Sequence, residues 1–409
     1  MSAEEESWPA GLVTPVLVFQ VANNFLTHSS LAIARSAGRV GVPVYGLYAG
    51  RRAPEARSRY WAGQFRHPGA SASDEDWLQT LDAIGADLDR AVLVTTDDAA
   101  TVLVARLGDK LHQHFLFPQQ SLELVRLLAD KRQVYDLCKR LGIPVPDTAF
   151  PQSRTEVAEH ARASRFPVVA KRIAAWEPTR RIGAATVAIL RSPEQLLSAY
   201  DAMESPIAPN VLLQEFIPGD DSSQAMHNGY FDRNSGCLVS FTGRKLRQRG
   251  SHNGPATLGE PTNNPEVERL TLELARAAGY RGILDADFRY DTRDGQYKLL
   301  DANPRIGSSF RMFVGANGID VFRALYLDLN DQPVPASMQR DGKWIAEPLD
   351  VVTAARQWRQ GELRAKAWRE SLRGVREWTW FARDDLRPFV SMLVACAAYG
   401  VRRRLSLAR

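Results

Sequence analysis

Short apolar runs alternate with helical patterns over the first third of the chain. The runs lie at residues 15–20, 41–48 and 91–98, each ends in polar residues, and helical patterns separate them. Strands that alternate with helices in this way are typical of a parallel α/β unit. Ligand contacts in such a sheet lie at the carboxyl ends of the strands, which points to the loops at residues 23–28 and 95–98. No G-x-G-x-x-G motif follows the first run, which disfavours a dinucleotide site.

The middle of the chain continues with one helical pattern and several strands. A helix is predicted over residues 127–142, with Gly142 as its C-terminal stop and Pro144 beyond it. Apolar strands follow at residues 166–173 and 210–217, and the second stops at Pro218. Residues 236–250 alternate like a strand, and the segment changes from apolar in its first half to basic in its second. Residues 282–305 form two strands joined at Asp294-Gly295, a strong hairpin signal.

The predicted hairpin concentrates polar side chains. Alternate residues of a strand share a face. One face therefore holds Asp285, Asp287 and Arg289 on the first strand and Asp301, Asn303 and Arg305 on the second.

Two interpretations fit this hairpin. Pairing the strands can bring Asp287 near Asp301 and Asn303, and such an oxygen-only set suits Mg²⁺ held together with substrate phosphates. Arg305 would then lie beside the metal as an anion clamp. The alternative is cross-strand pairing of aspartate with arginine on a solvated sheet face.

Cations upstream favour the first interpretation. Lys131 follows an acid on the predicted helix, Lys171 ends a strand, and Lys245 lies in a basic run. Each alone is typical of a solvated surface lysine. Together they supply the positive charge that a triphosphate with Mg²⁺ requires. The turn at Asp220 and Asp221 offers acceptors for ribose hydroxyls, although the stretch alone favours an ordinary polar Pro-Gly turn.

Composition narrows the class of protein. The 409 residues are 44% hydrophobic and 24% charged, an ordinary globular balance. The acidic, polar start and three scattered cysteines indicate a reducing, cytoplasmic location. Residues 351–409 contain 13 Lys and Arg against 5 Asp and Glu, so this tail carries +8 and the remainder −3 of the total +5. Basicity is therefore a property of the tail, and no nucleic-acid module is present in the pattern.

Six motifs occur in an order that a known superfamily shares. They are "DK…GIPVPDT", "PVVAKR", "LLQEFIPGDD", "FTGRKLRQ", "DADFRYD" and "LLDANPR". Through them, residues 15–335 resemble the ATP-grasp superfamily, and within it the carboxylate–amine ligases related to D-aspartate ligase and to the large chain of carbamoyl phosphate synthetase. The resemblance implies a Rossmann-like parallel α/β domain at residues 1–115 and a two-lobed ATP-grasp domain at residues 116–335. Residues 148–210 would form its lid, and residues 336–409 a helical tail.

The resemblance also implies roles for individual residues. Those that would bind ATP are Lys131, Lys171, Gln214, Glu215, Phe216, Ile217, Asp220 and Asp221. Asp287, Asp301 and Asn303 would hold Mg²⁺ or Mn²⁺, and Arg305 with Lys245 would stabilise the transferred phosphoryl group. The chain departs from the family at residues 174–186, where a Gly-rich phosphate loop is expected. Only Gly183 is present there, and Arg180 and Arg181 would supply charge instead.

The implied activity is amide or peptide bond formation. A carboxylate would attack the γ-phosphate of ATP, and an amine would displace phosphate from the resulting acylphosphate. The substrates are small molecules, nucleic acid is not a partner, and a homo-oligomer, a dimer, is expected. Arg247, Arg249, Arg311 and Ser308 are expected to contact the substrate. A phosphotransferase or carboxylase with the same ATP site, and a non-catalytic nucleotide-binding protein, remain as alternatives.

The tail has two interpretations of its own. Trp358, Leu363, Trp368 and Leu372 recur at near-helical spacing among arginines, and a short apolar segment at residues 389–401 precedes three consecutive arginines. This pattern fits an amphipathic helix packed on the catalytic core. It also fits a peripheral contact with a membrane surface.

Overall fold

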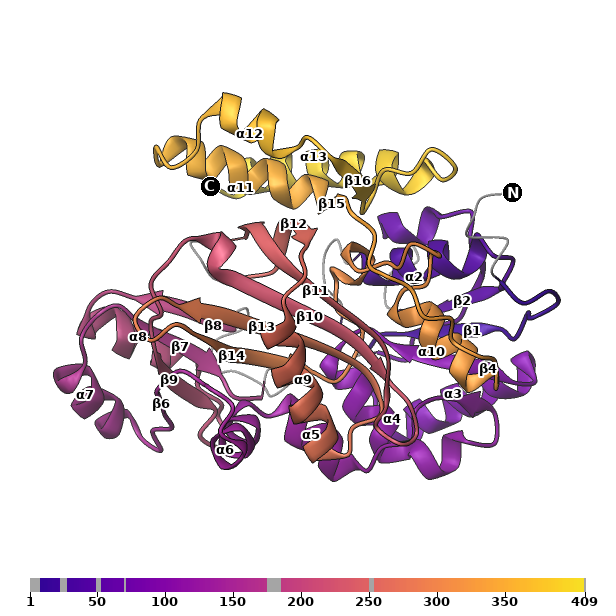
Figure 1. The fold of residues 1–409 in the computed structure, drawn as a ribbon, viewed down its shortest axis with the longest axis horizontal. Helices are drawn as coiled ribbons and strands as arrows, with labels where there is room; N and C mark the ends of the chain where they lie inside the picture. The colour runs from indigo at the N-terminus through magenta and orange to yellow at the C-terminus, as the bar shows by residue number, and fades with distance from the viewer. Residues whose placement is uncertain are drawn as a thin grey trace.

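The structure is a computed structural model. It describes residues 8–22, 28–48, 53–69, 71–174, 185–249 and 254–407, with side chains as far as residue 398. Figure 1 shows an N-terminal α/β unit, a long central sheet, a smaller sheet at the opposite end from the N-terminal unit, and a C-terminal layer along one side. This mixture of parallel and antiparallel sheets confirms the predicted α/β character.

The N-terminal unit is built on a parallel sheet. Its strands are β1 (Val16–Phe19), β2 (Val44–Leu47), β3 (Trp61–Gln64), β4 (Ala91–Thr95) and β5 (Phe115–Leu116), in the order β3-β2-β1-β4-β5. Alternate residues of β1 pack in different cores. Val16 and Val18 lie in the core that includes α2 (Ser29–Gly38), whereas Leu17 and Phe19 lie in the core with α3 (Asp74–Leu88) and α4 (Asp98–Leu111). Helices therefore cover both faces of the predicted parallel sheet.

The central sheet has seven strands in the order β14-β13-β10-β11-β12-β15-β16. They are β10 (Gln224–Phe231), β11 (Cys237–Gln248), β12 (Ala256–Pro261), β13 (Gly282–Asp291), β14 (Gln296–Asn303), β15 (Lys343–Ile345) and β16 (Val375–Trp378). Two helices from separate parts of the chain pack with it, α9 (Pro265–Ala278) and α10 (Val321–Leu329). The predicted hairpin is confirmed as β13 and β14, with Gly295 at a φ of 72° in the turn.

A smaller sheet forms a unit with its own core. Its strands are β6 (Thr148–Ala149), β7 (Val168–Arg172), β8 (Val187–Leu190) and β9 (Val211–Glu215), in the order β6-β9-β7-β8. The helices α7 (Arg154–Ala163) and α8 (Pro193–Met203) pack on this sheet through Val157, Leu196 and Tyr200. The core of this unit is separate from that of the central sheet.

The single helix predicted over residues 127–142 is wrong. The chain forms α5 (Leu122–Ala129) and α6 (Lys131–Leu141), which are separated at Asp130. Asp130 has an extended backbone, and its carboxylate accepts hydrogen bonds from the amides of Arg132 and Gln133. Aspartate is a preferred N-cap residue, so this local capping overrides the continuous helical pattern. As a result Lys131 occupies the first turn of α6.

The predicted helical tail has three helices but also contains strands. β15 and β16 extend the central sheet, and the helices in the described part of the tail are α11 (Glu347–Arg359), α12 (Ala365–Ser371) and α13 (Arg387–Leu407). Trp358 and Trp368 lie on different helices, because Gly361, at a φ of 77°, follows the end of α11. Within the described ranges, no helix combines the length and apolar character needed to cross a membrane.

Candidate active site

A cavity of about 380 Å³, here called the central cavity, lies between the smaller sheet and the central sheet. Its volume is within the range of small-molecule sites. The predicted residues that line it are Lys131, Lys171, Gln214, Glu215, Phe216, Ile217, Lys245, Asp287, Asp301, Asn303, Arg305 and Ser308. Residues separated by more than 150 positions in the sequence thus converge on one cavity.

Strand register explains how the acidic side chains meet. Asp287 lies directly opposite Asp301, and Asp285 lies directly opposite Asn303, in the antiparallel pair β13 and β14. Directly opposed residues have their Cβ atoms about 5 Å apart. The hairpin therefore presents three carboxylates and an amide to the central cavity, on the one face that the alternation of its sequence predicted.

Two lysines hold these carboxylates, and a third lysine lies beside them. Lys131 Nζ lies 2.9 Å from an Asp301 oxygen, and Lys245 Nζ lies 3.0 Å from an Asp287 oxygen. Lys171, at the end of β7, donates to the Leu300 carbonyl at 3.2 Å. The cations therefore surround the acids instead of facing solvent, and an incoming polyphosphate would compete with the acids for them.

Burial perturbs the ionisation of this cluster. It lowers the pKa of Lys171 to about 8, although the Asp301 carboxylate partly offsets the effect. Burial alone would raise the pKa of Asp301, but the charges of Lys131 and Lys171 outweigh it, so that pKa is lowered. Asp301 is thus an anion and Lys171 a cation at neutral pH. Pairs of groups with such environments are typical of sites that bind charged ligands.

Asp285 forms the far wall of the same cluster. Burial, with the neighbouring Asp287 carboxylate adding to it, raises the pKa of Asp285 to about 7. Asn228 donates a hydrogen bond to it at 3.2 Å. The backbone at Gly307 approaches so closely that a Cβ there would lie 2.3 Å from an Asp285 oxygen. This close approach explains the glycine in the sequence Pro304-Arg305-Ile306-Gly307.

The residues fit a magnesium ion, judged by their chemistry. Asp287, Asp301 and Asn303 offer only oxygen ligands on one wall of the cavity. Across the described ranges, no group of three or more His, Cys, Asp and Glu side chains is arranged to hold a metal by itself. Mg²⁺ differs from zinc in this respect, because it is commonly bound by one or two carboxylates together with phosphates and water.

Arg305 connects this cluster to the N-terminal unit. Its Nε lies 2.6 Å from an oxygen of Asp98, in the first turn of α4, and one Nη contacts the Asn303 amide oxygen at 3.3 Å. Asp98 lies in the predicted ligand-contact loop at residues 95–98 but was given no role of its own. The signal for it was its position just after β4, at the carboxyl end of a parallel strand.

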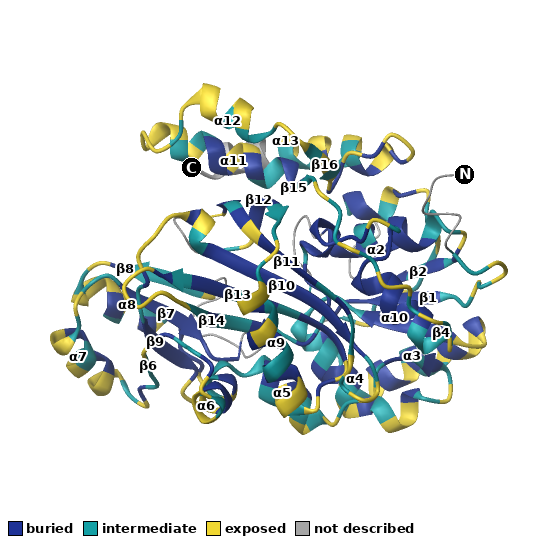
Figure 2. Cartoon of the chain, in the orientation of Figure 1, coloured by how far each residue is buried: buried dark blue, intermediate teal, exposed yellow. Residues whose placement is uncertain are grey.

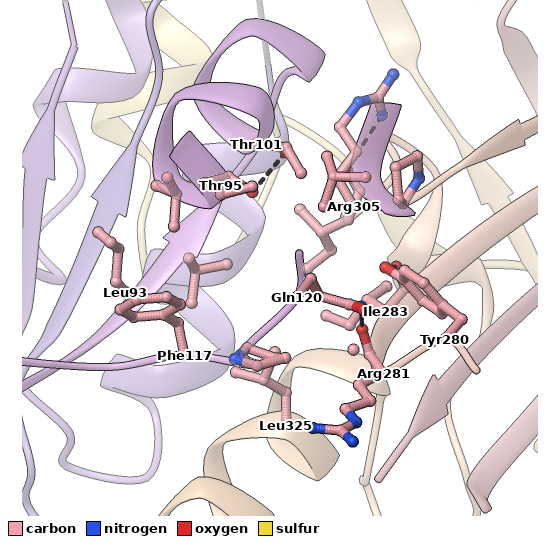
Figure 3. Close-up of a pocket in the computed structure, with 18 residues that line it drawn as sticks. Leu93, Thr95, Thr101, Phe117, Gln120, Tyr280, Arg281, Ile283, Arg305 and Leu325 are labelled. Carbon is pink, nitrogen blue, oxygen red and sulfur yellow. Dashed lines mark hydrogen bonds between the residues drawn. The ribbon is translucent and has the colours of Figure 1, made fainter. Parts of the chain in front are cut away.

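Arg305 also lines a second, smaller cavity of about 70 Å³ between β4, α4 and the start of β13. Figure 3 shows its guanidinium directed away from Leu93, Phe117 and Leu325, which surround this space. The walls are mostly apolar, and the volume is far below that of a typical ligand site. The chemistry therefore belongs to the central cavity, with Arg305 at the boundary of the two.

Arg289, which sequence reasoning gave no role, fixes the segment after β9. Its Nε donates to the Ile217 carbonyl at 2.9 Å, and an Nη donates to the Gly219 carbonyl at 2.6 Å. Its other Nη and the amide oxygen of Gln224 are buried without a hydrogen-bond partner among the described residues, and both side chains line the central cavity. Unpaired buried polar atoms at a cavity wall indicate a polar ligand.

Five predicted site residues lie outside the cavity: Asp220, Asp221, Arg247, Arg249 and Arg311. Asp221 is buried and accepts hydrogen bonds from the amide and side chain of Gln248 at 3.2 and 2.9 Å. Asp220 is exposed and accepts one from Ser222 at 2.7 Å. Arg249 is exposed.

Arg247 and Arg311 are buried in ion pairs with the C-terminal region. Arg247 lies 2.6 Å from Asp350 of α11, and Arg311 pairs with Asp320 and with Glu377 of β16. Asp350 and Glu377 belong to the C-terminal region, so both arginines anchor that region in this structure.

Several expected loops lie outside the described residues. These are residues 23–27, residues 175–184 with Arg180, Arg181 and Gly183, and residues 251–253. His28 and residues 254–259 are described, and Gly254 to Ala256 line the central cavity.

Comparison with known proteins confirms the resemblance to ATP-grasp enzymes. No family model matches the chain. The chain is 27% identical to D-aspartate ligase of Enterococcus faecium, over 57% of each chain. It is 27% identical to the carbamoyl phosphate synthase large chain of Thermus thermophilus, over 46% of this chain and 18% of that one. The chain therefore matches little more than half the length of one relative and a fifth of the other.

Solved structures support the fold. N5-carboxyaminoimidazole ribonucleotide synthetase in complex with ADP superposes with a TM-score of 0.62 at 13% identity, over 87% of this chain and 90% of that one. The biotin carboxylase domain of 2-oxoglutarate carboxylase from Hydrogenobacter thermophilus, with MgADP and bicarbonate, gives 0.58 at 17%, over 81% and 73%. L-amino acid ligase from Bacillus licheniformis gives 0.58 at 14%, over 78% and 74%. These are ATP-grasp enzymes, and the chain has their fold.

Proposed function

We propose that this chain is an ATP-dependent carboxylate–amine ligase that forms an amide or peptide bond and releases ADP and phosphate. The observation that supports this most is the convergence of Lys131, Lys171 and Lys245 on the Asp287–Asp301 pair in one cavity. Three cations and two carboxylates suit a nucleotide triphosphate with a divalent metal. The relatives named as ligases agree with this assignment.

In this proposal the cavity wall formed by Gln214, Glu215, Phe216 and Ile217 receives the adenine, mainly through backbone atoms. Lys131 and Lys171 bind phosphate oxygens. The side chain of Glu215 is occupied by Arg293 and Lys298, at 2.6 and 3.1 Å, which leaves its backbone for the base. Asp220 or Asp221 would reach the ribose only after the turn that carries them rearranges.

The charged groups of the cavity suit a reaction in two steps, phosphoryl transfer and then amide formation. The substrate carboxylate attacks the γ-phosphorus, ADP leaves, and an acylphosphate forms; the amine then attacks the acyl carbon and phosphate leaves. Arg305 and Lys245 stabilise the negative charge on the transferred group. Mg²⁺, held by Asp287, Asp301 and Asn303, would offset charge on the phosphate oxygens, and Mn²⁺ has the same ligand preference.

We further propose the domain arrangement that goes with this chemistry. Residues 1–115 form the N-terminal α/β domain and residues 116–335 the ATP-grasp domain, followed by residues 336–409. The unit at residues 148–210 acts as the lid, because an acylphosphate hydrolyses unless water is excluded. The core of the smaller sheet, which also includes Val211 and Leu213 of β9, is separate from that of the central sheet and supports movement as a body. The biotin carboxylase neighbour is a dimer in its crystal, and we propose a homodimer here, which sedimentation equilibrium would test.

The decisive experiment is a screen of carboxylate and amine pairs for ADP release, with mass spectrometry of the products. A ligase releases ADP only when both substrates are present, and the product contains both. Bicarbonate-dependent ADP release without an amine would support a carboxylase instead. No ADP release with any pair, together with normal ATP binding, would support a non-catalytic nucleotide-binding protein.

The metal assignment has its own test. Asp301→Asn keeps the size of the side chain but removes the charge that a metal needs, so ADP release should fall by about a thousandfold or more. The folded state should persist, as judged by circular dichroism. Asp201→Asn is the control, because Asp201 forms an exposed ion pair with Arg154 and lies outside the cavity lining. Near-normal ADP release by Asp301→Asn would contradict the assignment.

A further inference from the structure

The outward side of α13 is apolar and exposed. Val390, Leu393 and Val394 have exposed fractions of 57, 51 and 65%, and Ala397 follows them at the same helical spacing and is also exposed. We call these four residues the α13 face. No charged residue occurs from residue 388 to residue 401. A helix on a protein surface normally presents charged or polar residues to solvent. An apolar outer side is therefore unusual for a helix that faces water.

The other side of α13 fixes its orientation. Phe389, Met392 and Cys396 pack with the buried side chains of Leu31 and Trp380. The helix also runs along η1 (Pro54–Arg57) of the N-terminal unit. The α13 face therefore points away from the protein because the opposite side is already used in packing. Figure 2 shows this C-terminal layer with much of its outer surface exposed.

Exposed apolar side chains gather in this region of the molecule. Among the large hydrophobic residues that the described structure exposes, nine of twelve lie between Val351 and Val394. They include the aromatic residues Trp358, Trp378 and Phe381, with exposed fractions of 66, 37 and 36%. Clusters of this kind mark surfaces that contact another molecule or a membrane.

Charge identifies the kind of partner. Between residues 351 and 398 the exposed Arg and Lys are Arg356, Arg359, Arg364, Lys366, Arg369, Arg373, Arg376, Arg383 and Arg387, against the exposed acids Glu362, Glu370 and Asp384. The α13 backbone continues to Leu407 through Arg402, Arg403 and Arg404. An apolar helix face with cations at both ends and aromatic residues nearby suits the interface of an anionic lipid bilayer.

A second copy of the chain fits this surface less well. A two-fold interface brings the same patch of both copies together. Helices packed antiparallel would place Arg383 and Arg387 of one copy near residues 402–404 of the other, and like charges in contact oppose association. Parallel helices would bring each cationic end of α13 against the same cationic end of the other copy. Anionic lipid headgroups instead neutralise both ends.

We propose that the α13 face is a peripheral docking surface for an anionic lipid bilayer, on which the helix lies in the plane of the interface. This inference is independent of the proposed ligase activity. It places the membrane contact on α13 and its flanking arginines, because the segment from Trp358 to Leu372 is divided between two helices and a turn. The side chains of the α13 face would enter the boundary between headgroups and acyl chains, and the arginines would contact phosphates.

The test is co-sedimentation of the full chain with lipid vesicles. Vesicles of equal parts phosphatidylcholine and phosphatidylglycerol should bind the chain, and phosphatidylcholine vesicles should bind at least about tenfold less. Leu393→Asp and Val394→Asp should each reduce binding by about tenfold or more, because a carboxylate would enter the interface. Arg387→Glu should weaken binding and reduce its dependence on salt.

The matched control is Ile207→Asp, because Ile207 is 74% exposed and lies between α8 and β9, far along the chain from α13. It should bind vesicles like the original chain. Equal binding by Leu393→Asp, or no binding of the original chain to anionic vesicles, would overturn the proposal. So would a lipid-free dimer in sedimentation equilibrium that Leu393→Asp dissociates, since the face would then be covered by a second copy. Thermal unfolding of each variant separates loss of docking from loss of fold.

Discussion

Arg305 depends on a residue from another part of the molecule. Asp98 lies 2.6 Å from its Nε, and both side chains are largely buried, with exposed fractions of 23 and 19%. The contact joins residues that are 207 positions apart. Asp98 therefore determines where the guanidinium points while it stabilises phosphoryl transfer in the proposed reaction.

Asp98→Asn should lower kcat by about a hundredfold, because a small misplacement of a charge-stabilising group costs that much. The KM for ATP should change little, and Asp98→Glu should recover part of the loss. Asp74→Asn is the control, since Asp74 forms an exposed ion pair with Arg106 in the same unit. If Asp98→Asn retained full kcat, Arg305 would be positioned by other contacts.

Lys171 gives the proposed enzyme a pH dependence with a defined direction. Burial lowers its pKa to about 8 from the ordinary lysine value. The ammonium is therefore present below pH 8 and is lost as pH rises through about 8. The KM for ATP should rise across that range, because a neutral amine no longer attracts phosphate.

Lys171→Arg should remove most of this rise, since arginine stays charged at these pH values. Steady-state kinetics between pH 6.5 and 9.5, roughly one to two units on each side of the expected transition, would reveal it. The same rise in Lys171→Arg as in the original chain would assign the transition to another group.

Elements with a short-range signal could be predicted from the sequence. The alternation in Asp285–Asp287 and Asp301–Asn303 predicted one polar face, and Asp294-Gly295 predicted the turn that aligns the two strands. The interruption at Asp130 could not be separated from the helical pattern around it. An aspartate can cap a helix or lie within one, and the helical pattern on both sides of Asp130 did not show which of the two it does.

The break between α5 and α6 at Asp130 should affect nucleotide binding as well as stability. Asp130→Ala removes the N-cap of α6 and should lower the free energy of unfolding by about 1 kcal/mol. It should also raise the KM for ATP, because Lys131 lies in the turn that Asp130 fixes. Urea unfolding and kinetics measure the two effects. Ser121→Ala removes the N-cap of α5, which lies outside the site, and should produce only the first effect. A normal KM for ATP in Asp130→Ala would mean that the N-cap does not determine the position of Lys131.

At the scale of the whole molecule, the role of the C-terminal region could not be predicted. Arg247 and Arg311 lie in basic or polar segments beside the predicted site, and nothing local reveals that Asp350 and Glu377 neutralise them. The strands β15 and β16 are three and four residues long, too short for a periodic signal. Their place in the sheet comes from β12, whose edge they cover.

The C-terminal region also binds the N-terminal unit through buried polar contacts, so the stabilities of the two parts should be coupled. Arg35 of α2 lies 3.0 Å from Asp385, with exposed fractions of 5 and 1%, and donates to the carbonyls of Thr379 and Trp380. Asp385 also accepts from Ser58 at 2.6 Å. The central sheet, the N-terminal unit and the C-terminal region are thus joined by buried ion pairs, whereas the smaller sheet, with β9 included, has a core of its own.

Arg35→Met should therefore destabilise the N-terminal unit and the C-terminal region together. Removing one partner of a buried ion pair costs about 3–5 kcal/mol, because the other charge stays buried without compensation. Hydrogen exchange followed by mass spectrometry should show faster exchange in β1 and in β16, with β7 and β9 unchanged. Arg154→Met, which removes an exposed ion pair with Asp201 on the smaller unit, should leave all four strands unchanged. Faster exchange in β16 alone would mean that the C-terminal region is an appendage, because the N-terminal unit would then keep its stability without it.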